Sequence, residues 1–169
     1  MKPAPTAIFE NPAAAYAPEQ PLSELGFAEQ FVVWCLRVQW RAAEDGAPHP
    51  LLVQRAFDAL ELPGGAETVA DLAQALRRAV ARPLSIPCPH WRVLTSDEAR
   101  ILAFIGALQR RERASPPFAR HGGPAPCGAS PVWAPAQRLA LALAAAGLRL
   151  GNGLLPGVAF PEAMPRLLH

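Results

Sequence analysis

FAEQFVVWCLRVQWR, residues 27–41, is the stretch of sequence that decides the fold. At about 100° per residue, its main apolar side chains fall on one narrow arc of a helix: Phe27, Phe31, Trp34 and Val38. Further apolar residues lie on the opposite side, so the helix is apolar nearly all round, which is typical of a central bundle position. With Ser23 as N-cap and Gly46 after the end, the pattern predicts a helix over 23–44.

Four more helices follow from the apolar periodicity, over residues 50–62, 67–82, 95–113 and 134–148. The fourth begins with a capping box, in which Thr95 is the N-cap and Glu98 is the third helical residue. The sequence predicts an all-α fold, a compact bundle of about five helices with Pro-rich N-terminal and C-terminal tails. The expected division is a Pro-rich tail over 1–21, the bundle over 22–150 with a Gly/Pro loop at 114–131, and an irregular tail over 151–169.

Composition supports this class and narrows the functions. Alanine makes up about a fifth of the 169 residues, and the β-branched residues that favour strands are scarce. The formal net charge of +2 is small for a polyanion binder, so we expect no nucleic-acid partner. No apolar stretch is long enough to cross a bilayer. Three cysteines and no apolar leader at the N-terminus indicate a cytoplasmic protein without a membrane partner.

The segment IPCPHWRVLTSDE, residues 86–98, concentrates the residues that carry chemistry. Zinc takes four thiolate or imidazole ligands in a tetrahedron, so one hypothesis is a zinc site formed by Cys88, His90, His121 and Cys127. A second interpretation is a rigid crossover, because each proline fixes a backbone angle. Trp91 would then pack into the end of the bundle. A third is a reactive Cys88 thiolate beside His90 and Arg92.

Partner binding has its own candidates on the first helix. Trp40 lies opposite the main apolar stripe, which predicts an exposed anchor for a protein partner. Arg37 and Arg41 belong to the polar stripe of the same helix. No catalytic set stands out, because Asp97 and Glu98 are explained by helix capping and no Gly-x-Ser-x-Gly motif occurs.

These observations favour a non-enzymatic cytoplasmic interaction or regulatory protein that binds an unknown protein or a second copy of itself. The alternative is a metal- or thiol-dependent sensor centred on Cys88 and His90. Apart from zinc, no cofactor is expected.

Two short motifs, FVVWCLR at residues 31–37 and LTSDEARIL at residues 94–102, resemble small uncharacterised helical proteins of alphaproteobacteria. The resemblance extends over about residues 29–111, half of the chain. It implies a helical domain and carries no established activity, so no functional residue follows from it.

Overall fold

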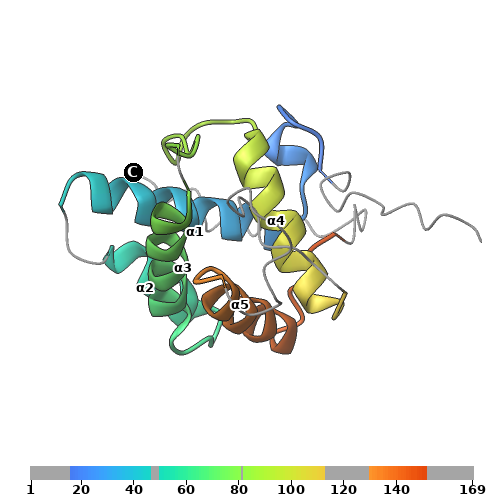
Figure 1. Ribbon diagram of the computed structural model, residues 1–169. Helices are drawn as coiled ribbons and strands as arrows, with labels where there is room; N and C mark the ends of the chain where they lie inside the picture. Colours follow the sequence, from blue (N-terminus) through green and yellow to red (C-terminus); the bar gives the residue numbers. More distant parts are fainter. Residues whose placement is uncertain (1–15, 47–49, 81, 113–129, 152–169) are drawn as a thin grey trace, which may run out of the picture.

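The computed structural model describes residues 16–46, 50–80, 82–112 and 130–151 (Figure 1). In these residues the protein is all-helical, as the sequence predicts, with a short 3-10 helix and five α-helices. The elements in chain order are η2 (Leu22–Glu24), α1 (Phe27–Glu44), α2 (Leu51–Ala59), α3 (Gly65–Ala79), α4 (Ser96–Gln109) and α5 (Trp133–Ala145).

All five helices contribute buried apolar side chains to one core. α1 packs against α2, α3 and α4, while α5 packs against α3 and α4. Cys35 is fully buried in α1. Burial raises the pKa of its thiol, since the thiolate would be desolvated there. α4 is buried along nearly its whole length, so it is at least as central as α1.

The start of α1 differs from the prediction. The helix begins at Phe27 after Gly26, and Ser23 lies inside η2 instead of capping α1. The cause is Leu25, which is extended and buried, and whose carbonyl oxygen accepts a hydrogen bond from Gln30 Nε2 at 2.8 Å. The end of α4 also differs, because α4 stops at Gln109 instead of residue 113, and Arg111 has a positive φ of 57°.

A close approach sets the geometry between α2 and α3. A Cβ atom on Gly65 would lie 2.0 Å from Phe57 Cδ1, so only glycine lets the phenyl ring pack on the α3 backbone. Gly64 has a φ of 74°, and this left-handed residue turns the chain into α3. α3 therefore begins at Gly65, earlier than the prediction of residue 67.

The first turn of α1 joins segments from both ends of the described chain. Glu29 is buried and accepts hydrogen bonds from Tyr16 Oη at 3.3 Å and from the Gly151 amide at 2.8 Å. Burial and the adjacent Glu29 charge raise the pKa of Tyr16 well above its usual range, so its phenol stays a donor. This arrangement holds the N-terminal segment against the helices. No helix in the described ranges is long and apolar enough to cross a membrane.

Candidate functional site

The crossover, residues 80–95, connects α3 to α4 and carries the motif that the sequence singled out; its described residues, 80 and 82–95, are not helical. Figure 1 shows it passing over one end of the bundle, between α3 and the start of α4. Leu84 and Leu94 are buried and anchor it to the core. Between them the chain turns at residues 88–91, where the Trp91 amide donates to the Cys88 carbonyl at 3.0 Å.

The N-terminal segment runs antiparallel to the end of the crossover. Pro21 and Val93 form a β-bridge. The Leu94 amide donates to the Gln20 carbonyl at 2.8 Å, and the Glu19 amide donates to the Leu94 carbonyl at 2.9 Å. These bonds satisfy one edge of residues 92–94 and give the crossover a fixed partner.

Arg37 satisfies the other edge. Its side chain is fully buried, and its Nη1 and Nη2 donate to the carbonyl oxygens of Trp91 and Val93, the latter at 2.8 Å. The same guanidinium forms a bidentate pair with Glu98, at 2.6 Å from Nε and 2.8 Å from Nη2. Glu98 also accepts from the Thr95 amide at 2.9 Å and completes the capping box, which is confirmed. One buried ion pair therefore joins α1, the crossover and α4.

A second ion pair joins the start of the crossover to the first turn of α4. Arg82 donates to both carboxylate oxygens of Asp97, at 2.6 and 2.9 Å, and the Ser85 amide donates to Asp97 Oδ2 at 2.8 Å. Thr95 Oγ1 in turn donates to the Ser85 carbonyl at 2.7 Å. Burial alone would raise the pKa of Asp97, but these hydrogen bonds and the charges of Arg82 and Arg100 outweigh it. The pKa therefore lies below its usual range.

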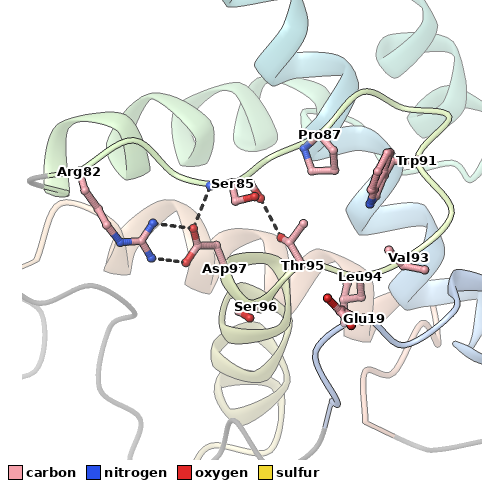
Figure 2. Close-up of a pocket in the computed structure, with 10 residues that line it drawn as sticks. All are labelled: Glu19, Arg82, Ser85, Pro87, Trp91, Val93, Leu94, Thr95, Ser96 and Asp97. Atoms are coloured by element: carbon pink, nitrogen blue, oxygen red, sulfur yellow. Dashed lines mark hydrogen bonds and ion pairs between the residues drawn. The ribbon is translucent and has the colours of Figure 1, made fainter.

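A groove of about 490 Å³ opens between the crossover, the start of α4 and the N-terminal segment (Figure 2). Its polar lining residues are Glu19, Arg82, Ser85, Thr95, Ser96 and Asp97. Its apolar lining residues are Pro87, Trp91, Val93 and Leu94.

Two residues that line the groove have unusual properties: Trp91 is a large apolar side chain exposed to solvent, and Glu19 has a left-handed backbone conformation. Trp91 is 52% exposed, so the prediction that it packs into the end of the bundle is wrong. The reason is the turn at residues 88–91, which holds the indole above the groove while the Trp91 carbonyl faces Arg37. Glu19 has a φ of 63°, a left-handed conformation that few residues other than glycine adopt. Strained residues of this kind cluster at functional sites.

The structure brings together only part of the predicted zinc site. Cys88 and His90 are both exposed and share the turn at residues 88–91. His121 and Cys127 lie outside the described residues, so the four-ligand site stays a prediction. Across the described ranges, no group of three or more His, Cys, Asp or Glu side chains is placed to hold a metal ion.

The predicted partner-binding residues are arranged differently from the expectation. Trp40 is only 7% exposed, so the expectation that its side chain is exposed is wrong. The Arg77 guanidinium from α3 covers the Trp40 ring at 4.2 Å and donates to the Trp40 carbonyl at 2.6 Å. Arg37 is likewise buried, because it pairs with Glu98. Arg41 is exposed and pairs with neighbouring carboxylates of its own helix, Glu44 and Asp45.

The position of Glu19 in the groove could not be predicted from the sequence. Nothing in the sequence indicates its positive φ, which depends on pairing with a segment 75 residues later in the chain. Trp91 and Asp97 lie within residues 86–98, where the sequence concentrates the residues that carry chemistry. Their contacts, however, could not be predicted from residue spacing. The signal that could have directed attention to the groove was an aromatic residue beside two prolines in a connection between helices.

Comparison of the chain with protein-family models, curated proteins and solved structures finds no match. The resemblance to small helical proteins of alphaproteobacteria therefore stays a prediction.

Proposed function

We propose that this chain is a non-enzymatic cytoplasmic interaction or regulatory protein that holds its partner at the groove beside the crossover. The observation that carries the proposal is the half-exposed indole of Trp91 on a backbone fixed along both edges. Exposed tryptophans in rigid surroundings are favoured binding anchors, since they bury a large area on binding with little loss of conformational entropy. The proposed partner-binding surface therefore centres on Trp91 instead of Trp40.

Affinity purification from the source cell tests this proposal. The wild-type chain is compared with Trp91→Ala, and with Leu141→Ala as a matched control, because Leu141 is 55% exposed on α5 and lies outside the groove lining. We expect the partner recovered with the wild type to be reduced about tenfold or more with Trp91→Ala, since a tryptophan anchor contributes 2 kcal/mol or more. It should be unchanged with Leu141→Ala. Equal recovery with the Trp91 variant would contradict the assignment.

The second candidate is the metal- or thiol-dependent sensor centred on Cys88 and His90. It is favoured by the exposure of both side chains in one turn, since a thiol must be reached by its oxidant or metal. Cys88→Ser separates the two functions. An interaction protein keeps its partner in this variant, whereas a sensor loses its response to zinc or to peroxide. Native mass spectrometry of the protein purified from its own host reads out bound metal, self-association and partner in one measurement.

A further inference from the structure

One carboxylate of the groove lining has no charged partner among the described residues. Two acidic side chains, Glu19 and Asp97, and one basic side chain, Arg82, line it. Arg82 is held by Asp97 through two hydrogen bonds, so these two charges cancel locally. For the Glu19 carboxylate, the described part of the chain contains neither an ion pair nor a hydrogen bond. Within the described residues, the Glu19 carboxylate is therefore available to a ligand.

The backbone fixes where this charge stands. The left-handed φ of Glu19 is maintained by its amide bond to the Leu94 carbonyl and by the adjacent bridge between Pro21 and Val93. Without this pairing a glutamate would relax to a negative φ. The Glu19 side chain is consequently positioned by a strained but well-supported residue, which is the pattern seen at ligand-binding positions.

The other part of the groove is apolar and aromatic. Trp91 and Val93 are two residues apart in an extended segment, so their side chains lie on the same face. Pro87 adds to this wall. Figure 2 shows Trp91 and Arg82 at opposite ends of the groove, with Asp97 beside Arg82. The face of a tryptophan ring attracts cations more strongly than other aromatic rings do.

We propose that the groove binds an organic cation with an apolar stem, an alkylguanidinium or alkylammonium group. The stem packs on Trp91, Pro87 and Val93, and the cationic head pairs with Glu19. This inference rests on the proposed function and names the chemistry by which the groove holds its partner, namely an arginine or lysine side chain. An anionic ligand is disfavoured, because Asp97 already occupies Arg82 and the ligand would face Glu19. The volume of about 490 Å³ is that of an ordinary small-ligand site.

The test uses two small probes of similar size and opposite charge, butylguanidinium and pentanoate. Binding is followed through the NMR signals of the Trp91 indole N–H, assigned with Trp91→Phe, and of the Val93 amide. We expect a saturable shift with butylguanidinium and none with pentanoate. Glu19→Gln should weaken binding by about fivefold, as for an exposed ion pair. Glu24→Gln, which changes an exposed carboxylate in η2 outside the groove lining, should leave binding unchanged.

A peptide arm separates the two sources of the same chemistry. If acetyl-Gly-Arg-Gly-amide binds more tightly than butylguanidinium and depends on Glu19, the occupant is a side chain of a partner. Equal affinity instead supports a free alkyl cation. Equal shifts with butylguanidinium and pentanoate, or equal binding of acetyl-Gly-Glu-Gly-amide, would overturn the proposal. If partner recovery depends on Trp91 while the groove shows no preference for cations, the proposed function stands and this inference fails.

Discussion

Arg37 is buried completely, and a buried guanidinium needs a counter-charge and hydrogen-bond acceptors within reach. Glu98 supplies the charge, and the carbonyl groups of Trp91 and Val93 supply the remaining acceptors. The carbonyl groups would otherwise lie unpaired on the inner edge of the crossover. The helix pattern places Arg37 only in a polar stripe, because its partner Glu98 lies 61 residues away and leaves no trace in local spacing.

Replacing Arg37 by methionine tests the role of this pair. Arg37→Met leaves the Glu98 carboxylate and two carbonyl groups without their donor, so the free energy of unfolding should fall by about 3–5 kcal/mol. Urea denaturation at neutral pH measures the change. Arg41→Met is the control, since Arg41 is exposed, and should change stability by no more than about 0.5 kcal/mol.

The second variant in this series is the double substitution Arg37→Met with Glu98→Gln. Glutamine retains the capping box with Thr95 and removes the buried charge. We expect the double variant to be more stable than Arg37→Met alone. If the double variant is less stable than Arg37→Met, the explanation through an uncompensated carboxylate is contradicted.

The ion pair between Arg82 and Asp97 makes the stability of the protein depend on pH. The pKa of Asp97 is lower in the folded chain than in the unfolded chain. The ionised carboxylate therefore contributes fully to the free energy of unfolding at pH values above the unfolded pKa of about 3.9. This stabilisation is lost as the pH falls through the pKa that Asp97 has in the folded chain. Asp97→Asn should therefore lower stability at pH 7 by about 1–3 kcal/mol. The difference from wild type should shrink below about pH 4. Asp58→Asn, at an exposed position, is the control for urea titrations across this range. A gap that stays constant down to pH 2 would argue against the ion pair.

The helices of this protein can be predicted from its sequence more completely than the connections between them. The apolar stripes and the Thr95–Glu98 capping box gave the five helices and the start of α4, since both signals are local. The first residue of α1 was missed because Leu25 is pulled into the core before the helix begins. The crossover was correctly seen as irregular, but the outward direction of Trp91 depends on tertiary bonds from Arg37 and the N-terminal segment.

Gly65 tests the packing between α2 and α3. Gly65→Ala adds a methyl group where Phe57 already lies, so the variant should lose about 1–3 kcal/mol of stability despite the better helix propensity of alanine. Gly106→Ala in α4 is the matched control, because its nearest neighbour is the flexible end of Arg110 at 3.2 Å. The control should be neutral or more stable. Similar thermal midpoints for the two variants would contradict the close approach of Phe57.

At the scale of the whole molecule, the fold is a helical bundle whose irregular segments are fixed by a few polar side chains. Glu29 joins the two ends of the described chain, Glu98 joins α1 to the crossover, and Asp97 joins the start of the crossover to α4. Burial of apolar faces explains the helices, and these could be predicted. The carboxylate contacts connect residues far apart in the sequence, so the groove they shape could not be.

Arg37 and the N-terminal segment together hold the crossover against the bundle. Native-state hydrogen exchange of the Leu94 amide, which donates to the Gln20 carbonyl, measures how firmly the crossover is held. We predict protection of Leu94 comparable to that of the α1 amides in the wild type, and a selective loss of this protection in Arg37→Met. Exchange of Leu94 at the rate of an unstructured chain, while α1 stays protected in the wild type, would contradict the account.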